Sequence, residues 1–273
     1  MSVVGRGLTG ALALALSWVV GAAAAELRPH RALYGIELAT MRGSSDINAL
    51  SGRMVLEWVD ACDGWTVNQK VRMQFTSREG SELHNEFSFS SFESKNGDNF
   101  RFTMRSLANG NPLEEFVGVA TRGRAGAVAR FTEPPDEKLV LPRDTLFPTE
   151  HLFVLVEGAL TGETWVGKTV FSGTGLDSLH EVTAFIGKEI PAGSKPVPMA
   201  GEGDEEIVAL ADLRSWPVSM AYFPYDQQDA EPEFEMVYRL MENGVAGVLT
   251  LDYGDFAMRA ILARLEILPV PDC

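Results

Sequence analysis

The fold is decided by a stretch of alternating polarity, Trp65-Thr66-Val67-Asn68-Gln69-Lys70-Val71-Arg72-Met73-Gln74-Phe75-Thr76. Every second side chain from Trp65 to Phe75 is apolar except Gln69, and the side chains between them are polar. A period of two places these two sets on opposite faces of a strand. We therefore expect a half-buried antiparallel strand, with one face on the core and the other in water.

The same alternation recurs along most of the chain after His30. Further apolar series are Met54-Leu56-Trp58, Phe87-Phe89, Phe100-Phe102-Met104, Phe234-Met236-Tyr238-Leu240 and Ile261-Ala263-Leu265-Ile267. Turn residues separate them at hairpin spacing, at Asp63-Gly64, Glu79-Gly80, Asn96-Gly97-Asp98, Asn109-Gly110, Asn243-Gly244 and Tyr253-Gly254-Asp255. A twisted sheet of more than about ten strands curls, splits or closes. The sequence thus predicts a mainly β fold, a single large antiparallel sheet rolled until its early and late strands meet.

One segment departs from this pattern. Apolar side chains follow Phe147-Pro148-Thr149 at helical spacing as far as Leu160. We expect one amphipathic helix near residues 149–161, with Thr149 as its N-cap and Gly162 as its stop, covering an open end of the sheet. The stretch from Pro191 to Glu206 is rich in Gly, Pro and acidic residues, which predicts a mobile loop.

The first 25 residues have the pattern of a secretory signal peptide. Arg6 precedes an apolar run from Leu8 to Val20, and three alanines then offer cleavage between Ala25 and Glu26. The run is too short to span a bilayer comfortably, and no later stretch is apolar for long enough to do so. We expect residues 26–273 to form a single soluble domain in an oxidising compartment.

The net charge limits the classes of binding partner that the protein is expected to have. The formal charge is −15, and loss of Arg6 with the signal peptide changes it to −16. An acidic protein repels phosphate backbones and anionic headgroups, which argues against nucleic acid and against membrane attachment through a polybasic patch. The acidity is expected to keep an exported domain soluble.

Cys62 and Cys273 are the only two cysteines. In an exported protein such a pair is more often a structural disulfide than a metal or redox site, and no Cys-x-x-Cys motif is present. An intramolecular bond would enclose nearly the whole chain. The alternative is an intermolecular bond through Cys273 on a free tail.

The sequence predicts no catalytic, cofactor or metal site. The four histidines, His30, His84, His151 and His180, are not spaced as zinc ligands. A hydrolase triad built from Asp177, His180 and either Ser172 or Ser178 is an alternative, but neither serine lies in a nucleophile elbow. Two acidic groups lack the spacing of a calcium loop, namely Glu202, Asp204, Glu205, Glu206 and Asp226, Asp229, Glu231, Glu233, Glu235.

Several short motifs carry a family resemblance from residue 30 to the end of the chain. They are His30-Arg31-Ala32-x-Tyr34, Gly52-Arg53-Met54 with Glu57, Cys62-Asp63-Gly64-Trp65, Gly118-Val119-Ala120-Thr121-Arg122-Gly123, Phe147-Pro148-Thr149-x-His151 and the late Cys273. With these the chain resembles the EipB-like family, periplasmic proteins of alphaproteobacteria long catalogued as a domain of unknown function. The resemblance implies a curled β-spiral or broken barrel, a disulfide between Cys62 and Cys273, and a role in cell envelope integrity without a known catalytic activity.

We therefore expect a non-enzymatic periplasmic monomer that supports envelope integrity. It would bind another envelope protein or a lipid or peptide ligand, through a concave face or exposed edge strands. An alternative is a lipid or lipoprotein carrier, because a rolled sheet too wide to be filled by its own side chains leaves an apolar cavity. A transmembrane β-barrel is a further alternative, although the central helix fits it poorly.

Overall fold

The computed structural model describes residues 26–43, 45–124, 126–201, 203–227 and 230–273. The predicted signal peptide, residues 1–25, lies outside them, and so does Ala25 of the expected cleavage site. Fourteen strands form one sheet in which all neighbouring strands are antiparallel. The prediction of a mainly β fold with a single large antiparallel sheet is confirmed.

Most successive strands are joined by short hairpins, but α1 lies between β8 and β9 and α2 lies between β10 and β11. Their bounds are β1 His30–Met41, β2 Ile47–Asp60, β3 Gly64–Ser77, β4 Glu82–Ser94, β5 Asn99–Ala108, β6 Asn111–Gly123, β7 Gly126–Glu133, β8 Lys138–Leu141, β9 Trp165–Phe171, β10 Leu179–Ile186, β11 Ser215–Pro224, β12 Phe234–Met241, β13 Ala246–Asp252 and β14 Phe256–Ile267. The helices are α1 Pro148–Thr161 and the short α2 Glu205–Ala209, which runs into a 3-10 turn, Leu210–Asp212. Within the described ranges, no helix has the length and apolar character needed to cross a bilayer.

The sheet order shows how the spiral is closed. The order is β8-β7-β6-β5-β4-β3-β2-β1-β14-β13-β12-β11-β10-β9. The first and last strands pair along their length, with His30 opposite Ile267 and Met41 opposite Phe256. The early and late strands therefore meet, as expected. The strands at the two edges are β8 and β9, which are successive in the chain and connected through α1.

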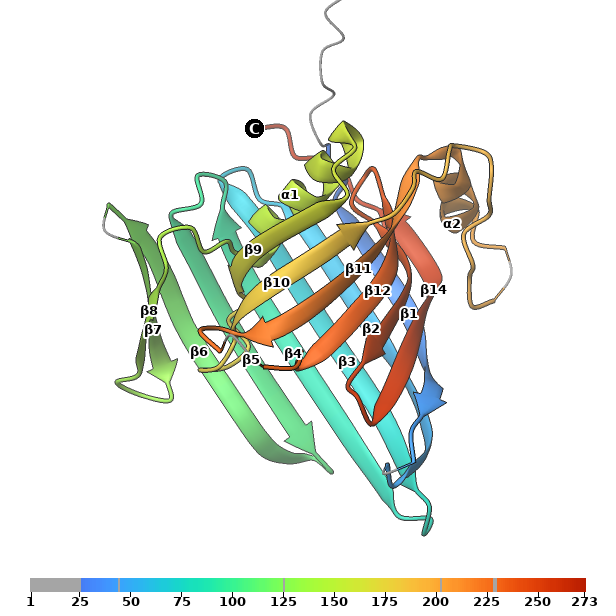
Figure 1. The fold of residues 1–273 in the computed structure, drawn as a ribbon, viewed down its shortest axis with the longest axis horizontal. Coiled ribbons are helices and arrows are strands. Elements are labelled where there is room, and N and C mark those ends of the chain that lie inside the picture. The colour runs from blue at the N-terminus through green and yellow to red at the C-terminus, as the bar shows by residue number, and fades with distance from the viewer. Residues whose placement is uncertain (1–25, 44, 125, 202, 228–229) are drawn as a thin grey trace, which may run out of the picture.

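The edge at β9 lies over the inner face of the first half of the sheet instead of pairing with β8. Figure 1 shows β9–β12 in front of β3–β6. The ring of Phe171 on β9 packs against Phe102 on β5 at a centroid distance of 5.5 Å. At Gly173, where φ is +72°, a Cβ would lie 2.7 Å from the Phe102 ring, so only glycine permits this approach. The overlap makes the sheet a spiral.

The strand faces are assigned correctly except on β14. Phe100, Phe102 and Met104 are buried, as the alternation predicted. On β14 the buried residues include Leu262 and Leu265, whereas the predicted series placed Ile261 and Ala263 inside. The register shifts here, because Leu33 lies opposite Arg264 and Tyr34 opposite Leu262. The extra residue, Ala263, forms a bulge that reverses the phase of the alternation.

The described part of the stretch predicted as a mobile loop, residues 191–201 and 203–206, is held against the sheet by hydrogen bonds. Arg239 on β12 donates hydrogen bonds to the carbonyl oxygens of Pro196 and Lys195, at 2.7 and 3.1 Å. Val197 is buried, and the N–H of Ala200 donates to the carbonyl of Leu262 at 2.8 Å. The stretch ends in α2, which the sequence did not predict because five residues carry too little helical periodicity.

Cys62 and Cys273 form a disulfide, with their Cα atoms 5.8 Å apart and a sequence separation of 211. Cys62 lies in the turn between β2 and β3, and Cys273 ends the tail that follows β14. Of the two pairings considered, the structure contains the intramolecular one. The bond fixes the C-terminal tail at the end of the spiral where α1 lies (Figure 1).

Candidate functional site

α1 closes one end of the spiral. Its buried residues Leu155, Val156 and Ala159 share a hydrophobic cluster with Trp58 of β2 and with side chains of β9–β12. The prediction of Gly162 as the stop is confirmed, since Gly162 caps the helix at φ 82°. The prediction of Thr149 as the N-cap is wrong: the cap is Phe147, because Pro148 begins the helix at its favoured first position.

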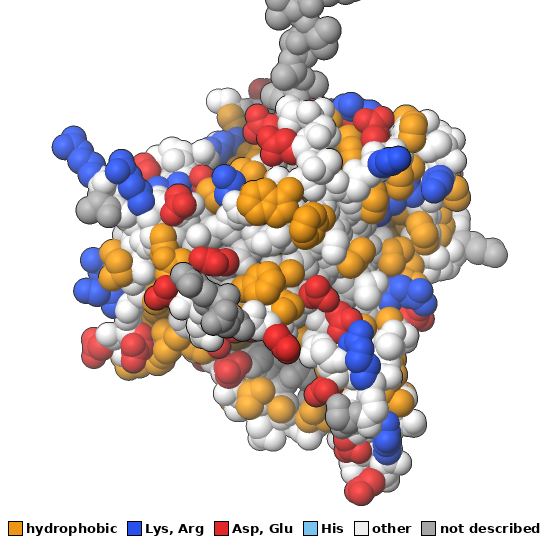
Figure 2. Space-filling view, viewed as in Figure 1, with side chains coloured by type: hydrophobic (Ala, Val, Ile, Leu, Met, Phe, Trp, Pro, Cys, Tyr) orange, Lys and Arg blue, Asp and Glu red, His pale blue; other side chains and the backbone are white. Residues whose placement is uncertain are grey.

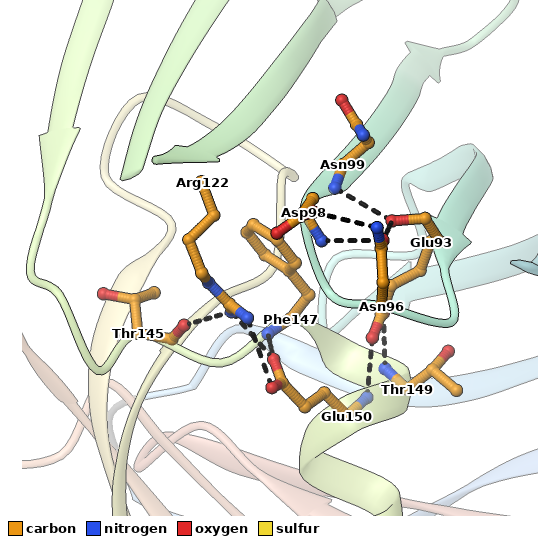
Figure 3. Close-up of polar contacts among 10 residues, drawn as sticks. Glu93, Asn96, Asp98, Asn99, Arg122, Thr145, Phe147, Thr149 and Glu150 are labelled. Atoms are coloured by element: carbon orange, nitrogen blue, oxygen red, sulfur yellow. Dashed lines mark hydrogen bonds and ion pairs between the residues drawn. The ribbon is translucent and has the colours of Figure 1, made fainter. Parts of the chain in front are cut away.

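The N-terminus of α1 is capped from a neighbouring strand. Phe147 has no side-chain acceptor, and Glu93 on β4 takes its place. The carboxylate of Glu93 accepts hydrogen bonds from the backbone N–H groups of Thr149 and Glu150, at 2.8 and 2.7 Å (Figure 3). Negative charge at this position also complements the helix dipole.

A second contact fastens α1 to β6. The guanidinium of Arg122 pairs with the carboxylate of Glu150 at 2.8 Å and donates to the carbonyl of Thr145 at 2.8 Å (Figure 3). It also lies over the Phe147 ring, 4.9 Å from its centroid. Glu93 and Arg122 thus hold one helix end from two strands, so α1 is a fixed plug.

Two ionisable side chains are buried at this end of the spiral, Glu93 on β4 and His151 on α1 itself. Burial raises the pKa of Glu93 to about 7, although the backbone hydrogen bonds from Thr149 and Glu150 oppose the rise. Burial, with a smaller contribution from Lys168, lowers the pKa of His151 to about 4. His151 is 5% exposed and its Nε2 has no hydrogen-bond partner among the described residues, so it stays neutral.

The opposite end of the spiral is open and contains an apolar cleft of about 570 Å³. The cleft lies where β3 ends and where β2, β4 and β14 begin. Its apolar lining is Ile47, Met73, Phe75, Leu83, Tyr253, Phe256 and Met258. Its polar lining is Asp46, Thr76, Ser77, Ser81, Glu82 and Asn85. The volume falls within the range of about 300–1,000 Å³ typical of small-molecule sites.

A row of aromatic rings runs from this cleft across the inner face. Phe75 meets Phe256 edge-on, with centroids 6.2 Å apart, and Phe256 stacks on Tyr253 at 5.3 Å. Tyr253 lies 6.0 Å from Phe234, which stacks on Tyr222 at 4.2 Å. Adjacent rings of this kind form an apolar wall with polar tyrosine hydroxyl groups.

The residues of the hydrolase alternative do not form a triad. Nε2 of His180 lies 2.8 Å from a carboxylate oxygen of Glu233. Ser178 donates to the carbonyl of Gly175, and Ser172 pairs with Thr174. No hydrogen bond joins His180 to either serine among the described residues.

Two members of the acidic groups, Asp204 and Glu233, have local structural roles. Asp204 caps α2 by accepting from the N–H of Ile207 at 3.0 Å, and its other oxygen accepts from the N–H of Leu265. Glu233 pairs with His180. Glu202 and Asp229 lie outside the described residues. In the part of the chain that the structure describes, no cluster of three His, Cys, Asp or Glu side chains is placed to hold a metal ion.

The outer face of β9–β12 also carries exposed apolar side chains. Trp165 and Phe185 are 56% and 59% exposed and lie directly opposite each other on β9 and β10. Figure 2 shows hydrophobic side chains in the middle of this face. The edge at β9 is partly paired, because Leu146 bridges to Val170 in parallel. The β9 edge therefore has fewer free backbone groups for docking a partner than the expected exposed edge strand would have.

Comparisons with known proteins cover nearly the whole chain. The model of a family described as EipB-like matches residues 21–269. The chain is 31% identical over 249 residues to the cell envelope integrity protein EipB of Brucella abortus (strain 2308), covering 90% of this chain and 86% of that protein. A crystal structure of a beta-barrel-like protein of a domain of unknown function, also from Brucella abortus, has a TM-score of 0.81 and 31% identity, covering 90% of this chain and 100% of its own. The match to the family includes every strand from β1 to β14.

Proposed function

Because the chain belongs to the EipB-like family, we propose that it supports cell envelope integrity as a non-enzymatic periplasmic protein that binds another envelope component. The proposal rests on the apolar cleft at the open end of the spiral. An exported protein in water gains nothing from leaving Met73, Phe75 and Phe256 around an open cleft unless something occupies it.

The lining favours a ligand with an apolar part and a polar end. The aromatic and aliphatic side chains would bury the apolar part. The polar lining, including Ser77, Ser81 and Asn85, would hydrogen-bond the polar end. An acyl chain with its headgroup and an apolar peptide segment both have this chemistry.

Carriage of a lipid or lipoprotein is the second candidate, and one observation favours it. Inner-face side chains between the cleft and α1 are only half-buried, including Met54, Leu56, Gln69 and Phe87. An acyl chain that entered the cleft would find further apolar contacts along this face. α1 would then act as the closed floor of the spiral.

Native mass spectrometry of protein purified from the periplasm without detergent tests the binding step. We expect a mass increase from a bound ligand, or saturable binding of an apolar fluorescent probe. Protein that carries no ligand and binds no such probe would contradict both candidates.

Two further assays test the envelope role and the absence of catalysis. Deletion of the gene should sensitise cells to detergents and to envelope-targeting antibiotics, and unchanged sensitivity would argue against the role. Esterase and peptidase assays should be silent for the wild type and for His180→Ala. If the wild type hydrolysed a substrate and His180→Ala did not, the proposal of a non-enzymatic protein would be wrong.

A further inference from the structure

A groove of about 500 Å³ crosses the outer face of β1–β5. This face points away from the spiral interior and from the apolar cleft. Four cationic side chains line the groove, namely Arg53, Lys70, Arg72 and Arg105, and Glu86 is the one acidic side chain in the lining. In a chain of net charge −15, such a local excess of positive charge needs a physical reason.

The strand register gathers these cations. Arg53 on β2 lies directly opposite Arg72 on β3. Lys70, two residues along β3 on the same face, lies opposite Ser88 on β4, which in turn lies opposite Arg105 on β5. Like charges placed directly opposite each other destabilise a sheet. The pair of Arg53 and Arg72 therefore costs stability unless an anion lies between the guanidinium groups.

The acidic neighbours neutralise only half of the cluster. Arg72 pairs with Glu86 at 3.1 Å, and Arg105 pairs with Glu115 on β6. Arg53 and Lys70 make no ion pair or hydrogen bond with any side chain that the structure describes. Two unpaired cations thus remain in the groove beside two exposed ion pairs.

Aliphatic side chains are interspersed with the cations. Leu33, Val55 and Leu107 also line the groove, and Val55 is 40% exposed. A guanidinium presents a planar fork that matches a phosphate oxygen pair, and aliphatic groups beside it favour the glycerol and upper acyl region of a lipid. We propose that this groove docks the protein on the phosphate-bearing headgroups of an anionic lipid surface.

The net charge does not oppose this docking at close range. At physiological salt, the repulsion between an anionic surface and acidic side chains that lie more than about 8 Å from it is largely screened. The groove residues act at contact distance, where screening matters less. The net charge by itself argues against membrane attachment through a polybasic patch. It contains no information about strand register, which places four cationic side chains on one face of the sheet.

Vesicle sedimentation tests the proposal directly. Wild-type protein should bind vesicles containing phosphatidylglycerol at about 0.15 M salt and should not bind phosphatidylcholine vesicles. Arg53→Gln/Lys70→Gln should bind the anionic vesicles about 30-fold more weakly, since each cation near an anionic surface contributes about fivefold. The matched control is Lys138→Gln/Arg143→Gln, which removes the same charge at exposed positions on and beyond β8 and should bind as wild type.

The outcomes distinguish a lipid surface from free phosphate and from nonspecific adhesion to vesicles. Equal binding to both vesicle types, or equal weakening by the two double variants, would overturn the groove as the docking site. Titration of inorganic phosphate monitored by amide NMR shifts supplies a second arm. Saturable phosphate binding at the groove without vesicle binding would overturn the lipid assignment. Leu83→Asp changes the cleft and not the groove, so it should leave vesicle binding unchanged. Failure of the groove proposal and failure of the proposed function can therefore be distinguished.

Discussion

The carboxylate of Glu93 caps α1 by accepting a hydrogen bond of 2.8 Å from the backbone N–H of Thr149, which lies 56 residues further along the chain. Its other oxygen accepts from the N–H of Glu150 at 2.7 Å, and Glu93 is only 3% exposed. No side chain at Phe147 supplies an acceptor for this helix end. The end therefore depends on one acceptor from a distant strand.

Glu93→Ala should lower the free energy of unfolding by about 1–3 kcal/mol, since it leaves the buried N–H of Thr149 and the partly buried N–H of Glu150 without their acceptor. Glu93→Gln keeps one acceptor oxygen and should lose less. Urea unfolding at pH 7 measures both variants, with Glu82→Ala at the exposed start of β4 as the control. A Glu93→Ala protein with the wild-type midpoint would show that the cap is dispensable.

Glu93 also predicts a pH dependence. Its pKa rises from 4.5 in the unfolded chain to about 7 in the fold, so folding favours the protonated form. The associated stability is present below pH 4.5 and is lost as the pH rises through 7. Because Gln does not titrate, the stability of Glu93→Gln relative to wild type should increase between about pH 5 and pH 8. Urea unfolding that gave the same difference at both pH values would contradict the assignment.

His151 predicts the opposite dependence. Its pKa falls from 6.5 to about 4 on folding, so the fold favours the neutral ring. The associated stability is present above pH 6.5 and is lost as the pH falls towards 4. By pH 5 the free energy of unfolding should have fallen by about 2 kcal/mol, because each pH unit between the two pKa values contributes about 1.36 kcal/mol. His151→Leu should lose less stability than wild type on acidification. His84→Leu is the control, since His84 is exposed, and equal acid slopes in all three proteins would exclude His151 as the cause.

The sequence predicted what depends on local alternation and missed what depends on three-dimensional position. The period of two placed Phe100, Phe102 and Met104 inside correctly. The bulge at Ala263 has no sequence signal, because a bulge arises from the mismatch between two paired strands. The predicted phase of β14 is therefore right at Leu265 and wrong on the N-terminal side of the bulge.

The candidate site was harder to predict for the same reason. Met73 and Phe75 belong to the series that was assigned to the core, and they do face inward. Whether an inward side chain packs or lines a cleft depends on where α1 lies, and α1 covers only the far end. Two other features depend on strand register, namely the capping of α1 by Glu93 and the cationic groove. Strand register cannot be predicted from the amino-acid composition.

Removal of the disulfide should destabilise the protein. Cys62→Ser/Cys273→Ser opens a ring whose ends are separated by 211 positions in sequence, and loss of a native disulfide typically costs about 2–5 kcal/mol. Urea unfolding measures the cost. The intact mass of the oxidised monomer should lie about 2 Da below the reduced form, because two thiol hydrogens are lost. A chain with two free thiols would contradict the pairing.

Leu83→Asp should weaken ligand binding in the cleft. Leu83 lines the cleft and is 43% exposed, so the fold should tolerate a polar side chain there. The loss of one apolar contact of this size, about 1.5–3 kcal/mol when fully buried, corresponds to a decrease in affinity of about tenfold or more. The control is Leu113→Asp on β6, since Leu113 is 61% exposed and does not line the cleft. Fluorescence titration of an apolar probe measures both. Equal affinity of the two variants would mean that the probe binds elsewhere, and the proposed function would then lose the observation that carries it.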